Sequence, residues 1–254
     1  MAKEKAALVC DTAFISKVVN CVNDAVGDSI KEDMHGLRTK NSAPSRIWDL
    51  LNTKLCSSMS SVSCVANVTK RGSWQMVPVY DTNTGVLFTF MRESRYDELH
   101  KKVRNRKAPH YVDCLVDTLN PDLVAPVGQV SLFPIQSSDS ARMREVVQKI
   151  LYDLQVEEQA VKRHALILFS SSGFELLSIR AVMIDKRMDV VCEEDWKKYI
   201  STNISTIMES PDEYSSPANN PGRGLNLSVK ANERKKRNFG VKQPEFEKRS
   251  GESD

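Results

Sequence analysis

The stretch Val86-Leu87-Phe88-Thr89-Phe90-Met91 is an apolar run of the kind that forms a β-strand. It follows the turn signal Asp81-Thr82-Asn83-Thr84-Gly85, and two earlier strand patterns lie at residues 62–68 and 74–80. Strand patterns that alternate with short polar turns predict an antiparallel three-stranded meander. Pro78 predicts a sheet edge or a bulge in the middle strand, because proline has no N–H group to donate to a neighbouring strand.

A second group of strand patterns lies nearer the C-terminus, at residues 164–169, 174–184 and 188–192. The turn signals Ser170–Gly173 and Asp185–Arg187 separate these strands. They predict a second antiparallel meander. The sequence leaves open whether the two meanders form one mixed sheet or two smaller sheets.

Helical patterns surround both groups of strands, because apolar residues recur there at steps of three and four. Antiparallel β-meanders packed with helices place the chain in the α+β class. The predicted helices cover approximately residues 9–31, 46–55, 93–106, 111–119, 139–155 and 193–200.

The composition of the chain changes near Thr202, where Pro, Ser, Asn and Glu become frequent and apolar residues sparse. Such a segment buries too little apolar surface to offset the conformational entropy that ordering costs. We therefore predict an α+β globular region over residues 1–202 and a disordered tail with a basic segment over residues 203–254. The proline-containing stretch 120–138 is a candidate boundary within the globular region.

Composition and charge exclude several classes of protein. The 254 residues are 41% apolar and 27% charged, and the net charge of +3 gives no strong global case for a nucleic-acid partner. There is no apolar leader and no apolar stretch near the length of a transmembrane helix, so we expect a cytoplasmic protein without membrane contact. The six cysteines form no CxxC pair, which predicts small buried side chains rather than a zinc site or disulfides.

Catalytic and metal-binding motifs do not emerge from the sequence. The four histidines are spread out, with no HxH or HxxxH pair, and Ser170-Ser171-Ser172-Gly173 departs from the GxSxG pattern of a nucleophile elbow. The glycines are isolated, which disfavours a phosphate-cradling loop. We expect no metal and no cofactor, and the question of enzymatic activity stays open.

Two basic clusters are candidates for contact with nucleic acid, because clustered cations neutralise phosphates and release counterions. Five of the eight residues from His100 to Lys107 are Lys or Arg, although cations at a helix C-terminus are also favourable without any ligand. In the segment 69–74, expected to be an exposed loop, a tryptophan next to two basic residues could stack on a base or simply pack. The candidate residues are Lys70, Arg71, Trp74, Lys101, Lys102, Arg104, Arg106 and Lys107.

The predicted tail contains a further candidate site, of a kind that orders when it binds a protein partner. It combines turn-forming residues, two leucines and a short basic run. Its candidate partner-binding residues are Pro221, Arg223, Leu225, Leu227, Arg234, Lys235, Lys236 and Arg237.

Short sequence segments spread over nearly the whole chain resemble an uncharacterised bacterial domain family of unknown function. The resemblance implies genes in mobile or prophage-like regions, beside helix-turn-helix regulators and metallopeptidases, and hence a toxin–antitoxin or phage-defence module. It assigns no activity and no catalytic residue. The segments are Ser45–Thr53, Thr69–Trp74, Phe88–Glu93, Val161–Ser171 and Asn220–Leu225.

Three hypotheses of function follow. The first is a bacterial regulatory or interaction protein of a toxin–antitoxin or phage-defence locus, which binds a protein partner and has an undetermined oligomeric state. The alternative is a nucleic-acid-binding protein or nuclease that uses the helix end at 101–107 and the segment 69–74. The third is a structural protein without enzymatic activity.

Overall fold

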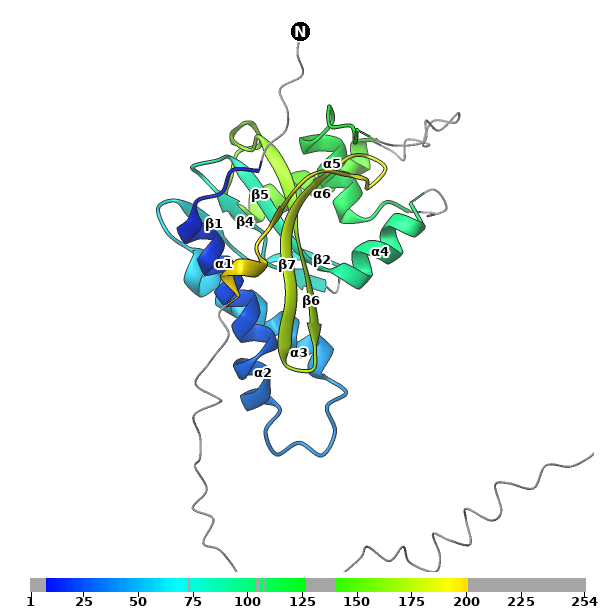
Figure 1. The fold of residues 1–254 in the computed structure, drawn as a ribbon. Helices are drawn as coiled ribbons and strands as arrows, with labels where there is room; N and C mark the ends of the chain where they lie inside the picture. Colours follow the sequence, from blue (N-terminus) through cyan, green and yellow to red (C-terminus); the bar gives the residue numbers. More distant parts are fainter. Residues whose placement is uncertain (1–7, 73, 104–105, 107, 127–139, 201–254) are drawn as a thin grey trace, which may run out of the picture. The chain divides into compact units, whose positions relative to one another are not determined.

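The fold is α+β, as predicted, and is built on one six-stranded sheet with strand order β1-β4-β5-β6-β7-β8 (Figure 1). The computed structural model describes residues 8–72, 74–103, 106, 108–126 and 140–200. The strands of this sheet are β1 (Cys64–Ala66), β4 (Val79–Asp81), β5 (Val86–Arg92), β6 (Arg163–Ser172), β7 (Glu175–Ile184) and β8 (Val190–Asp195).

Both predicted meanders exist, and they join side by side into a single mixed sheet. Strands β1, β4 and β5 pair antiparallel, as do β6, β7 and β8, whereas β5 and β6 pair in parallel with Phe88 opposite Ala165 and Phe90 opposite Ile167. Parallel neighbours need a long crossover connection. Here the crossover contains α4 (Glu93–Lys101), α5 (Tyr111–Leu119) and α6 (Ser140–Leu154).

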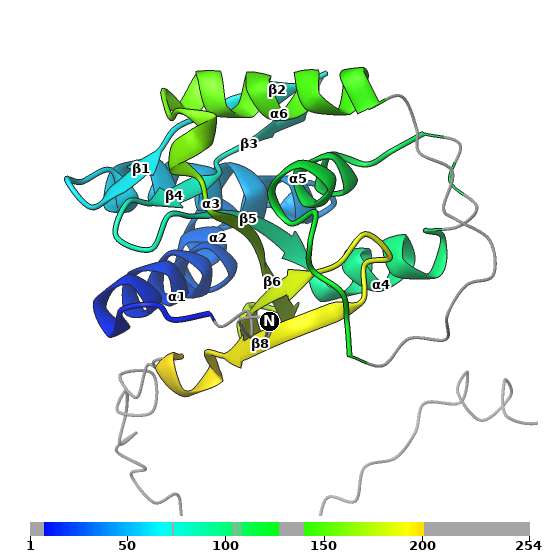
Figure 2. The same cartoon turned by 90° about the horizontal axis from the view of Figure 1, so that it is seen from above.

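Helices cover both faces of the sheet, because alternate residues of each central strand point to opposite sides. Phe88 and Phe90 of β5 belong to a core with α1 (Thr12–Val26), α2 (Asp28–Asp33) and α3 (Ala43–Met59). Leu87 and Met91 of the same strand belong to a second core with α4, α5 and α6. Figure 2 shows α1 and α2 on one side of β5 and β6, and α4 and α5 on the other.

A two-stranded antiparallel ribbon, β2 (Thr69–Arg71) and β3 (Trp74–Met76), is inserted between β1 and β4. The prediction of a loop over residues 69–74 is therefore wrong, since only the tip of the ribbon turns, at Gly72 with φ of +61°. The predicted strand 74–80 is two strands separated by Val77-Pro78, where the Asn52 side chain accepts a hydrogen bond from the Val77 N–H at 3.2 Å.

The predicted helix over residues 193–200 is wrong at its start. Residues 193–195 extend β8, with Glu193 opposite Val182 of β7, and only Lys197–Tyr199 form a single 3-10 turn. Hydrogen bonding to β7 outweighs local helix propensity here. The Trp196 side chain is completely buried, as predicted.

The other predicted helices are confirmed, most of them with different bounds. The helix predicted over 9–31 is divided at Gly27 into α1 and α2, and α3 extends the prediction of 46–55 in both directions. The helix predicted over 93–106 ends at Lys101 as α4, whereas α5 has the predicted bounds. The tail 203–254 and most of the candidate boundary at 120–138 lie outside the described residues.

All six cysteines are described, and each has a free thiol. Cys21, Cys64 and Cys114 are buried and the other three are partly buried, which confirms the prediction of small packed side chains. In the part of the chain that the structure describes, no helix combines the length and the apolar character needed to cross a lipid bilayer.

Candidate functional site

The candidate site is a pocket of about 390 Å³ beside the free edge of β5. Strand β4 pairs only with Val86–Phe88, so residues 89–92 of β5 extend past it. The β2–β3 ribbon, α3 and the first residues of α4 and α5 enclose the space beyond the end of β4. The lining residues are Trp48, Asn52, Arg71, Trp74, Met76, Val77, Pro78, Thr89, Phe90, Met91, Arg92, Arg95, His110 and Tyr111.

Aromatic rings form much of the pocket wall. Trp48 of α3 packs edge-on against Trp74 of the ribbon, with ring centroids 6.1 Å apart and planes at 78°. Trp48 also packs against the buried ring of Phe169 at 5.6 Å, which fixes its position. Trp74 remains 43% exposed, so part of this residue is accessible to a ligand in the pocket. Such aromatic platforms stack on nucleobases.

Three arginines line the same pocket, and the described lining residues include no carboxylate. The guanidinium of Arg71 lies over the Tyr111 ring, 4.6 Å from its centroid, and Arg71 forms no ion pair within the described residues. Arg95 binds Glu98 on the helix surface at 2.8 Å. Because the aromatic and cationic groups share one recess, the pocket suits a planar ligand that carries negative charge.

Arg92 ends β5 and occupies the N-cap position of α4, and its guanidinium has no counter-ion among the described residues. Its Nη2 atom is shielded from solvent and has no hydrogen-bond partner there, and its nearest ring contact is Phe169 at 5.9 Å. Burial lowers the pKa of Arg92. The adjacent carboxylate, Glu93, is bound by Arg180 and leaves Arg92 unneutralised.

His110 at the pocket wall has a structural role as the N-cap of α5. Its Nδ1 accepts a hydrogen bond from the Val112 N–H at 3.4 Å, while the His110 N–H donates to the Asp113 side chain at 2.6 Å. Burial, followed by the nearby charges of Arg71, Arg106 and Arg95, lowers the pKa of His110 to about 3. The ring is therefore neutral near pH 7 and adds no positive charge to the pocket.

A buried hydrogen-bond network supports the pocket from below. The hydroxyl of Thr89 lies 2.9 Å from His164 Nε2, within hydrogen-bond distance, and the Asn120 side chain bonds the His164 backbone. His164 is fully buried, which lowers its pKa to about 3. This network joins the pocket residue Thr89 of β5 to His164 of β6 and to Asn120 at the end of α5.

The predicted nucleic-acid candidates are distributed unevenly. Arg71 and Trp74 are opposite each other in the ribbon and both line the pocket, whereas Lys70 is exposed outside it. Lys101 and Lys102 are exposed at the C-terminal end of α4, away from the lining.

Arg106 has a different environment from the other candidates. It is paired with Asp113 at 2.7 Å, with only 14% of its side chain exposed, so its charge is used within the fold. The remaining candidates, Arg104, Lys107 and the tail residues from Pro221 to Arg237, lie outside the described residues.

Sequence reasoning missed several residues of the pocket, namely Trp48, Arg92, Arg95 and Tyr111. Trp48 lies in the helix predicted over 46–55 and is partly buried, and it also lines the pocket. The position of Arg92 and Arg95 where a buried strand meets a helix is a sequence feature that could have indicated an anion site, since helix N-termini favour anions.

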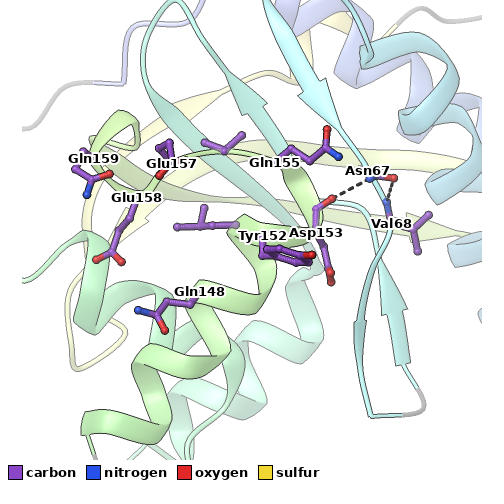
Figure 3. A pocket seen from close by; sticks show the side chains of 11 residues that line it. Asn67, Val68, Gln148, Tyr152, Asp153, Gln155, Glu157, Glu158 and Gln159 are labelled. Carbon is purple, nitrogen blue, oxygen red and sulfur yellow. Dashed lines mark hydrogen bonds between the residues drawn. The ribbon is translucent and has the colours of Figure 1, made fainter.

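A second hollow, of about 750 Å³, has the opposite electrostatic character (Figure 3). It lies at the C-terminal end of α6, and Asp153, Glu157 and Glu158 line it together with the exposed ring of Tyr152. Asn67 donates a hydrogen bond to the Asp153 carbonyl at 2.8 Å. No Lys or Arg is among its described lining residues, so this hollow does not suit an anion.

The fold and the pocket define an α+β protein with an arginine- and tryptophan-lined recess at a sheet edge. The chain belongs to the family of unknown function DUF5986, whose model matches residues 9–242. Comparisons with curated proteins and with solved structures found no match. Among the residues that the structure describes, no three His, Cys, Asp or Glu side chains gather where they could hold a metal ion.

Proposed function

We propose that the protein binds single-stranded nucleic acid and seats one nucleotide in the pocket beside β5. The observation that carries the proposal is the convergence of three arginines and four aromatic side chains on one recess whose described lining has no carboxylate. Nucleic acid presents both complementary groups, a flat base and an anionic phosphate.

The size and setting of the pocket favour a single strand over a duplex. A volume of about 390 Å³ is near the lower end of the range for ligand sites, about 300–1,000 Å³, and fits one nucleotide unit rather than a run of them. The rings of a duplex are stacked and paired, whereas an unpaired base can enter a recess and stack on a side chain.

Each part of the pocket has a distinct role in this proposal. The exposed part of Trp74, supported by Trp48, stacks on the base. Arg71, which lies over the Tyr111 ring, faces the phosphate as a guanidinium with no ion pair in the described part of the chain. Binding, rather than strand cleavage, is what these groups support.

The hypothesis of a protein partner in a toxin–antitoxin or phage-defence system remains a separate proposal. It depends on tail residues that lie outside the described ranges. A nucleic-acid-binding function of the pocket is compatible with such a role, but it requires no second protein. The pocket therefore makes nucleic-acid binding the first function to test.

Replacement of Trp74 by Ala is expected to weaken binding of a short single-stranded oligonucleotide by about 5- to 150-fold, since one base–aromatic stack contributes about 1–3 kcal/mol. The measurement is a fluorescence-anisotropy titration of the full chain with a labelled oligothymidine.

Tyr152→Ala is the matched control, because it removes an 82% exposed ring at the acidic hollow. Its affinity is expected to equal that of the wild type. Equal affinities for wild type, Trp74→Ala and Tyr152→Ala would show that the pocket is not the nucleic-acid-binding site.

A further inference from the structure

The side of the pocket formed by the start of α4 differs chemically from the side formed by Trp48 and Trp74. Arg92 and Arg95 occupy the N-cap and third positions of α4, so both project from the first turn of one helix. No side chain of the described residues caps this helix by a hydrogen bond. The first N–H groups of an α-helix have no partner within the helix and carry a partial positive charge, which favours anions.

Arg92 strengthens the case for an anion because its own charge is not compensated. A partly buried guanidinium without a carboxylate partner is costly unless a ligand supplies the negative charge. Glu93 is bound to Arg180, and Glu98 is bound to Arg95 on the helix surface. Glu93 lies in the first turn of α4 itself and Arg95 already has an acidic partner, so Arg92 is the arginine at this helix start that has no carboxylate partner among the described residues.

We infer that this region binds a terminal phosphomonoester, the group at the end of a nucleic-acid strand or on a free nucleoside monophosphate. A phosphomonoester carries a charge of about −1.5 to −2 at pH 7 and three terminal oxygens, whereas an internal phosphodiester carries a single charge. Arginine forks bind such oxygens in pairs. The inference rests on the proposed function, because it names the part of the nucleic acid that the pocket recognises.

The size of the pocket supports an end rather than an internal segment. A terminal nucleotide can occupy a recess of this size because the strand continues from it in one direction only. An internal nucleotide would require the strand to enter the recess and to leave it again. With a terminal nucleotide bound, Trp48 and Trp74 would stack on the base while Arg92 and Arg95 bind its phosphate.

The test compares one oligothymidine sequence with a 5′-phosphate, a 3′-phosphate or two hydroxyl ends, titrated into the full chain. One of the two phosphorylated forms is expected to bind at least about tenfold more tightly than the hydroxyl form, because the terminal phosphate adds charged hydrogen bonds to the arginines. Arg92→Met is expected to abolish this preference. Arg95→Gln, at an exposed position, is expected to reduce it and serves as the second variant if Arg92→Met does not fold.

Separate arms distinguish the source of the phosphate and the two proposals. Thymidine monophosphate that competes as strongly as the phosphorylated strand would assign the site to free nucleotides, and weak competition would assign it to strand ends. Equal affinities of phosphorylated and hydroxyl strands, with Trp74→Ala still weakening both, would overturn this inference but leave the proposed function. Binding of thymidine monophosphate without binding of any oligonucleotide would overturn the proposed function but leave the inference of a phosphomonoester site.

Discussion

Replacement of Arg71 by Glu is expected to weaken single-strand binding by about 2–3 kcal/mol, or roughly 30- to 150-fold, at moderate ionic strength. Arg71 lies over Tyr111 in the pocket, and no carboxylate of the described residues pairs with it. The substitution removes the cation that meets the phosphate and places a like charge there. The plot of log affinity against log salt concentration should also become less steep, by the amount expected for the loss of about one phosphate contact or more.

Lys70→Glu is the matched control for this substitution. It makes the same change in net charge one residue away, but Lys70 is exposed and does not line the pocket. Both substitutions weaken non-specific electrostatic attraction, but only Arg71→Glu also removes a contact in the pocket. We therefore expect Lys70→Glu to lower the affinity only a few-fold. If the two variants weakened binding equally, the strand would be attracted by the general charge of the ribbon and not held in the pocket.

Replacement of Asn120 by Ala is expected to lower the free energy of unfolding by about 2–5 kcal/mol. Asn120 is completely buried, and its side chain accepts from the His164 N–H and donates to the His164 carbonyl, both at 2.9 Å. Alanine would leave two buried backbone groups of β6 unpaired, each at a cost of about 1–3 kcal/mol. The same change would loosen His164, which holds Thr89 beneath the pocket.

Urea unfolding followed by circular dichroism measures this effect. Asn67→Ala is the comparison, because Asn67 also bonds a backbone carbonyl, that of Asp153 at 2.8 Å, but is exposed so that water replaces the lost bond. We expect less than about 1 kcal/mol for Asn67→Ala. A loss below 1 kcal/mol for Asn120→Ala would mean that the two-point bond to β6 contributes little to stability.

Much of the fold follows from local patterns in the sequence. The apolar run 86–91 and the amphipathic periodicity of α1, α5 and α6 predict their elements because burial of one face determines them locally. The second half of β8 does not follow from local patterns in the same way. Residues 193–195 are charged and next to Trp196, and only pairing with β7 makes them a strand.

The pocket could be predicted only in part, because its residues come from distant segments. Arg71 and Trp74 were identifiable together because they lie close in one basic segment, which was predicted as a loop and forms a ribbon that places them opposite each other. Trp48, Arg92 and Tyr111 join them only after the parallel pairing of β5 with β6 and the packing of α3 and α5. Dense positive charge at 101–107 was a stronger sequence signal, but its described lysines lie outside the pocket.

Photo-crosslinking of a thymine-containing single strand to the full chain, followed by peptide mapping, tests the central claim most directly. The claim is that a nucleotide occupies the recess formed by the ribbon, α3 and the starts of α4 and α5. We expect the main crosslinks in the peptides that contain Trp74 and Tyr111, and their loss in Arg71→Glu. Crosslinks confined to other peptides, such as those with Lys101 or Tyr152, would contradict the account.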